Sequence, residues 1–133
     1  MKKLARWARF NVVGVMGMAV QLGALAALNR CTPQHYLAAS AAALEATLLH
    51  NFAWHVNYTW RDRRDGSPLI AQLLRFHLSN GLVSMAGNLA LMRLLVEGAR
   101  MPPLAANGIA ILCCSLANFW VGDCWAFAHA ADA

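Results

Sequence analysis

The chain has 133 residues, of which 59% are hydrophobic and only 13% charged, with a mean hydropathy of +0.44. A soluble chain this short could not bury so much apolar surface, so the composition indicates a membrane protein. The net charge of +5 lies beside apolar segments. This placement argues against nucleic-acid binding and favours attraction to anionic lipid headgroups.

Four apolar segments follow one another along the chain, near residues 10–29, 36–57, 76–96 and 104–124. Each has the roughly 20 residues that a hydrocarbon core of about 30 Å requires. Lipid offers no partner for backbone polar groups, so each segment is expected to be helical. The sequence predicts an all-α membrane protein with four transmembrane helices. The first segment does not read as a cleaved signal peptide, because a second apolar segment follows after a brief break.

The two halves of the chain repeat one pattern, at a shift of 67 residues for most positions and 66 for the first. The repeated pairs are Arg9-Phe10 with Arg75-Phe76, Gly14 with Gly81, Asn51-Phe52 with Asn118-Phe119, Tyr58 with Trp125, and Trp60 with Phe127. We therefore predict a single transmembrane domain over 1–133, built as two helical hairpins, with repeat 1 at about 7–60 and repeat 2 at about 73–127.

Basic residues predict how the hairpins are oriented. They gather before the first apolar segment and around the central polar loop: Lys2, Lys3, Arg6, Arg9, Arg61, Arg63, Arg64 and Arg75. The positive-inside rule then puts both termini and the central loop in the cytoplasm. Both hairpins enter from the same side, so the repeat is parallel, not inverted.

Paired polar residues are the strongest candidates for a binding site. Asn51 and Asn118 are expected to converge with Arg9 and Arg75 around a cleft that faces the cytoplasm. Guanidinium and amide groups suit an anionic headgroup that carries phosphate and sugar oxygens. The alternative is interhelical amide bonding with arginines that snorkel to the interface.

Other polar residues lie on the second apolar segment alone. Glu45 is near its middle, where an ionised carboxylate is costly, and its counterpart in the second repeat is Leu112. It could bind a cation, carry a coupling proton, or simply hydrogen-bond to another helix. His50 and His55 are too far apart around the helix to form an obvious metal pair. The four cysteines show no metal-ligand spacing, and we predict no metal and no cofactor.

In its order of motifs the chain resembles the GtrA-like family of small four-helix membrane proteins. The resemblance runs from about Trp7 to Phe127 and includes the repeated pairs above, Pro33 with Tyr36, and Pro102-Pro103-Leu104. It implies translocation of an undecaprenyl- or other polyprenyl-phosphate-linked sugar across the bacterial inner membrane. A membrane glycosyltransferase would then use the sugar in cell-wall polysaccharide or lipopolysaccharide synthesis. The chain departs from the family pattern at Asp123, where a basic residue is common.

The predicted function is lipid flipping without enzymatic chemistry. The expected substrate-binding residues are Arg9, Asn51, His55, Arg75 and Asn118, with Glu45 and His50 as possible coupling or intramembrane polar groups. Expected partners are the lipid-linked sugar, membrane lipids and a second copy of the chain, most simply in a dimer. Two alternatives stay open, a membrane adaptor that recruits a glycosyltransferase and a small ion-coupled exporter that uses Glu45. The sequence contains no recognisable nucleotide-sugar site or nucleophile with its base, so no enzyme is expected.

Overall fold

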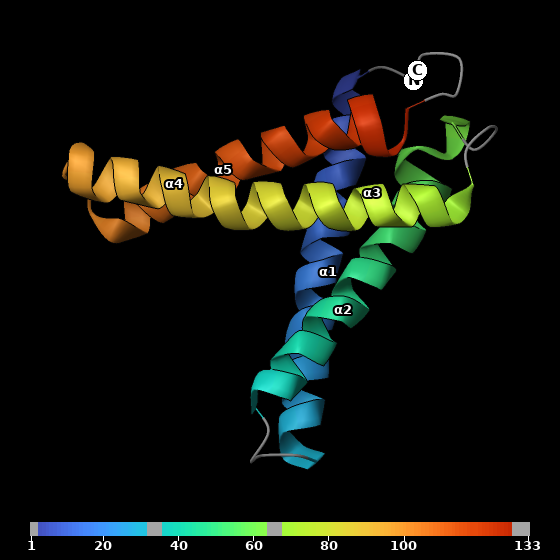
Figure 1. Cartoon of the computed structure of the whole chain (residues 1–133), viewed down its shortest axis with the longest axis horizontal. Helices are drawn as coiled ribbons and strands as arrows, with labels where there is room; N and C mark the ends of the chain where they lie inside the picture. Colours follow the sequence, from blue (N-terminus) through green and yellow to red (C-terminus); the bar gives the residue numbers. More distant parts are fainter. Residues whose placement is uncertain (1–2, 32–35, 64–67, 129–133) are drawn as a thin grey trace. The chain divides into compact units, whose positions relative to one another are not determined.

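The computed structural model describes residues 3–31, 36–63 and 68–128, and within these ranges the regular structure is entirely helical. The chain divides into two compact units, Met1–Arg64 and Asp65–Ala133. Each unit is a pair of helical segments that pack side by side (Figure 1). The prediction of an all-α membrane fold with four helices is confirmed.

In the first unit, α1 spans Lys3–Cys31 and α2 spans Tyr36–Trp54. The 29 residues of α1 extend about 44 Å, enough to cross a hydrocarbon core of about 30 Å. At its end α2 widens into a π-helical turn, His55–Thr59, and a short 3-10 turn, Arg61–Arg63, follows. α1 begins seven residues before the predicted segment, because the basic residues that precede it continue the helix.

In the second unit, one long helical run contains α3 (Leu69–Leu82) and α4 (Asn88–Arg93). Each of these helices is followed by a π-helical turn, Val83–Gly87 and Leu94–Gly98 respectively. The returning helix α5 spans Pro103–Val121 and ends in a π-helical turn, Gly122–Ala126.

The connection between α4 and α5 is a tight helix-ending turn. Arg100 adopts a positive φ of 54°, and the Met101 N–H donates to the Leu95 carbonyl at 2.9 Å. This arrangement satisfies carbonyls that the helix end would leave open. Pro103 then occupies the first turn of α5, where its missing N–H has no cost.

The 67-residue shift recurs in the details of the two units. The π-helical turns His55–Thr59 and Gly122–Ala126 stand at matching positions. Each is closed by the same backbone bond, Trp60 N–H to the His55 carbonyl at 2.8 Å and Phe127 N–H to the Gly122 carbonyl at 2.9 Å. Each buried terminal ring also meets the first phenylalanine of its own unit at 6.0 Å, Phe10 with Trp60 and Phe76 with Phe127. The repeat is therefore a repeat of contacts as well as of letters.

Small residues form the buried contacts between the helices of each unit. Ala39 and Ala43 are buried in the first unit, and their counterparts 67 residues later, Ala106 and Ala110, are buried in the second. Alanine lets two helix backbones approach closely, which is how helices associate where lipid replaces water. The large apolar side chains instead lie outside: Leu22, Leu44, Leu82, Leu89, Leu112 and others are exposed.

Two helical segments are long and apolar enough to cross a membrane, Lys3–Cys31 and Ala105–Ala126. Only 11% and 22% of their most apolar windows are buried. A core helix of a soluble protein would be mostly covered, so these exposed apolar faces suit lipid. The other two segments carry more polar residues, including Glu45 and Asn51 in α2 and Asn80 and Asn88 in the run from α3 to α4. These residues lower the hydropathy of the segments that hold the candidate site.

Candidate functional site

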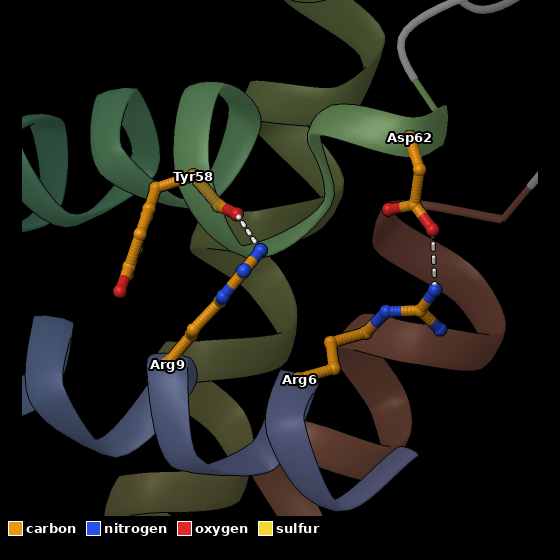
Figure 2. Close-up of polar contacts among 4 residues, drawn as sticks. All are labelled: Arg6, Arg9, Tyr58 and Asp62. Atoms are coloured by element: carbon orange, nitrogen blue, oxygen red, sulfur yellow. Dashed lines mark hydrogen bonds and ion pairs between the residues drawn. The ribbon is translucent and has the colours of Figure 1, made fainter. Parts of the chain in front are cut away.

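Arg9 lies at the end of the first unit, beside the last turn of the returning helix (Figure 2). Its Nη1 donates to the Tyr58 backbone carbonyl at 3.3 Å, and its guanidinium carbon lies 4.9 Å from the centre of the Tyr58 ring. Arginine carries several N–H donors in a fixed fork. Among the described residues Arg9 makes no other hydrogen bond or ion pair. Its remaining donors are therefore available to an anion.

A second arginine anchors the same end of the unit. Arg6 Nη2 lies 2.7 Å from Asp62 Oδ2 and joins α1 to the 3-10 turn that follows Tyr58 (Figure 2). Partial burial raises the pKa of Asp62, but a backbone hydrogen bond and the bond and charge of Arg6 outweigh it, so the pKa lies below its usual 3.8. The carboxylate is thus ionised at neutral pH, and the pair holds Tyr58 near Arg9.

His55 is enclosed within the first unit. Its side chain is 2% exposed and stacks on Phe10, with ring centres 4.9 Å apart and planes 10° apart. The Trp60 ring meets it edge-on at 5.2 Å, and its Nδ1 lies 3.0 Å from the Thr59 hydroxyl. These contacts give His55 a packing role. Its predicted contact with substrate stays a prediction and would require Phe10 to move.

Asn51 lies deeper along the hairpin, against α1. It is half-buried beside Gly17, where an added Cβ would overlap its amide group. His50 Nδ1 lies 3.1 Å from Asn51 Oδ1, so these two polar side chains satisfy each other. Gly17 is eight residues beyond Arg9, about 12 Å along the helix. The structure therefore does not bring Arg9 and Asn51 together at one depth.

Asn118 makes the equivalent contact in the second unit. Its Nδ2 donates to the Ser84 hydroxyl at 2.8 Å, and Ser84 stands 67 residues after Gly17. In the part of the chain that the structure describes, Asn118 Oδ1 and Asn88 Oδ1 are buried without a hydrogen-bond partner. Arg75, which is half-exposed, precedes Ser84 by nine residues, about 13 Å along the helix. The charged and amide groups again occupy separate levels.

Arg75 has no hydrogen bond or ion pair among the described residues, so its guanidinium is as available as that of Arg9. Glu45 is exposed on α2 and does not line the buried contact between α1 and α2. Its roles in coupling or in hydrogen bonding to another helix stay predictions.

The structure also shows residues that the sequence reasoning missed. A surface hollow on α2 is lined by Ala53, Trp54 and Asn57. The spacing of four between Trp54 and Tyr58 could have indicated that the two rings share a helix face. Gly17 could have been found by its place opposite Ser84 in the repeat.

Comparison with known proteins supports the likeness that the motifs indicate. No individual curated protein matches the chain. The family model described as GtrA/DPMS, transmembrane domain, matches residues 9–129. The match begins at Arg9 and covers the helices of both units. The chain therefore belongs to the GtrA/DPMS transmembrane-domain family, whose members are membrane proteins connected with lipid-linked sugars.

Proposed function

We propose that this protein moves a polyprenyl-phosphate-linked sugar, such as an undecaprenyl-phosphate sugar, from the cytoplasmic to the outer leaflet of the bacterial inner membrane. The sugar would serve cell-surface polysaccharide synthesis. No covalent bond is made or broken in this step, so the protein acts as a transporter and not as an enzyme.

The observation that carries the proposal is the available guanidinium of Arg9. It lies at the end of a membrane hairpin, uses one donor on Tyr58, and keeps the others for an anion. A forked donor array matches phosphate oxygens better than a single ammonium does. Arg75 starts the second copy of the pattern and is equally available among the described residues. A phosphate at the membrane surface would find these groups first.

The polar residues deeper in each unit support passage of the headgroup. A sugar phosphate cannot enter hydrocarbon unaided because it would lose its hydration. Asn51 and His50 in the first unit, and Ser84, Asn88 and Asn118 in the second, offer amide, imidazole and hydroxyl groups about 12 Å beyond the arginines. These groups would replace water while the polyprenyl tail stays in lipid. Four helices make a thin wall, so we expect a homodimer to enclose the path.

Reconstitution tests this function directly. Purified protein in liposomes is expected to move fluorescent undecaprenyl-phosphate glucose between leaflets, measured by quenching of the outer leaflet, without any glycosyltransferase. Empty liposomes set the background rate. Movement that requires an added glycosyltransferase, with the two proteins co-purifying, would instead support the adaptor function.

The orientation of the chain is a separate proposal, with both termini in the cytoplasm. Cys31 ends α1 and Cys124 lies in the last turn of α5, and both thiols are exposed. In variants that keep one cysteine each, an impermeant maleimide should label Cys31 on intact spheroplasts and Cys124 only after permeabilisation. Labelling of Cys124 on intact cells would contradict the proposed orientation.

A further inference from the structure

Three rings form a row along the outer face of α2 and its last turn. His50, Trp54 and Tyr58 are spaced four residues apart, with ring centres 6.3 Å and 6.2 Å between neighbours. Trp54 and Tyr58 meet edge to face and are 42% and 36% exposed. The row begins at the Asn51 partner His50 and ends over the Arg9 guanidinium. It therefore joins the polar level inside the hairpin to the cationic level at its end.

A hollow opens beside this row, lined by Ala53, Trp54 and Asn57. Ala53 contributes little volume, so the Trp54 ring forms one wall. Asn57 Nδ2 donates to the Ala53 carbonyl at 2.7 Å, which fixes the amide and leaves its Oδ1 as an acceptor. The hollow thus combines an aromatic surface with an oriented hydrogen-bond acceptor.

We propose that this hollow receives the sugar ring of the lipid-linked substrate while Arg9 holds the phosphate, an inference that rests on the proposed function. One face of a pyranose ring presents C–H groups, whose slight positive charge is attracted to the negative face of an aromatic ring. The Asn57 oxygen can accept a bond from a sugar hydroxyl. Trp54 is one helical turn from Tyr58, about 6 Å. That spacing suits a sugar directly bonded to its phosphate.

The second unit lacks this combination. The residues 67 positions after Trp54 and Asn57 are Val121 and Cys124, which offer neither a ring nor an amide. Arg75 repeats the guanidinium, however. The two units are therefore expected to share phosphate binding, and the first alone to recognise the sugar.

Exposed tryptophan and tyrosine also occur at membrane interfaces as general anchors. Trp120 provides a matched control for that role, since it is 67% exposed on α5 and its unit has no such hollow among the described lining residues. An anchoring role would affect Trp54 and Trp120 alike and would ignore the sugar. A sugar-binding role would separate them.

The experiment compares two probes, undecaprenyl-phosphate glucose and undecaprenyl phosphate, bound to the full chain in nanodiscs. Trp54→Leu should weaken binding of the glucose probe by about three- to tenfold and leave the bare phosphate unchanged. Asn57→Ala should act in the same direction. Arg9→Gln should weaken both probes, whereas Trp120→Leu should change neither. Galactose and mannose versions of the probe extend the comparison to other hexoses.

The outcomes separate this inference from the proposed function. If the wild-type protein binds neither probe, the proposed function itself fails. If it binds all hexose probes no more tightly than bare undecaprenyl phosphate, or if Trp54→Leu weakens all probes equally, only the sugar hollow is overturned. A selective loss with Trp54→Leu, together with unchanged thermal stability, establishes it.

Discussion

Replacing Arg9 and Arg75 together by glutamine is expected to weaken binding of undecaprenyl-phosphate glucose by about a hundredfold and to stop its movement in liposomes. A hydrogen bond to a charged group contributes about 1.5–3 kcal/mol. Each single replacement should therefore weaken binding by about tenfold or more. Both side chains keep unused donors among the described residues, so each would lose a contact with the ligand and not an ion pair of the fold. Binding in nanodiscs and quenching in liposomes measure the two effects.

A matched charge removal controls for electrostatics. Arg30 is exposed in the last turn of α1, at the opposite end from Arg9, so Arg30→Gln should leave binding unchanged. Arg9→Lys keeps the charge but loses the fork, and it should bind with intermediate affinity. Undiminished binding in both Arg9→Gln and Arg75→Gln would assign these arginines to snorkelling at the interface.

Adding one methyl group at Gly17 is expected to destabilise the first unit, whereas the same change at Gly14 should not. A Cβ at Gly17 would overlap the Asn51 amide, while no atom lies within 4 Å of a Cβ at Gly14. Overfilling a packed contact costs about 1–3 kcal/mol. Alanine at Gly14 should even favour the helix, by up to about 1 kcal/mol. Thermal unfolding in detergent should show Gly17→Ala melting several degrees below both wild type and Gly14→Ala.

A double variant identifies the cause. Asn51→Ala removes the amide that Gly17→Ala would meet, so the double variant should lose less stability than the two single changes summed. Equal melting of Gly17→Ala and Gly14→Ala would show that Asn51 simply moves aside. The contact at Gly17 would then have no structural weight.

The helices could be predicted from the sequence because membrane thickness and hydropathy fix their number and length. The break near Pro102 was equally foreseeable, since proline begins α5. The left-handed Arg100 was not, because the residue that usually takes this conformation is glycine, and Gly98 stands two positions earlier. The π-helical turns were also missed, since their extra residue per turn leaves no mark in the hydropathy pattern.

The candidate site was only partly predictable. Repetition drew attention to Arg9 and Asn51, but spacing alone could not show that they lie at different levels. That separation depends on which residues of α1 each one faces, Tyr58 closing over Arg9 and Gly17 receiving Asn51. Trp54 and Asn57 were missed because they have no counterparts in the second copy. A search guided by repetition overlooks what only one copy contains.

The wide turn Val83–Gly87 has a consequence for how the two copies can diverge in length. Phe76 and Ser84 are eight residues apart, whereas Phe10 and Gly17, which hold the matching places, are seven apart. In a regular α-helix one inserted residue would rotate everything beyond it by about 100°. A π-helical turn spreads more residues over each revolution and so absorbs part of that rotation. The second copy can therefore carry an insertion and still present Ser84 to Asn118 as Gly17 is presented to Asn51.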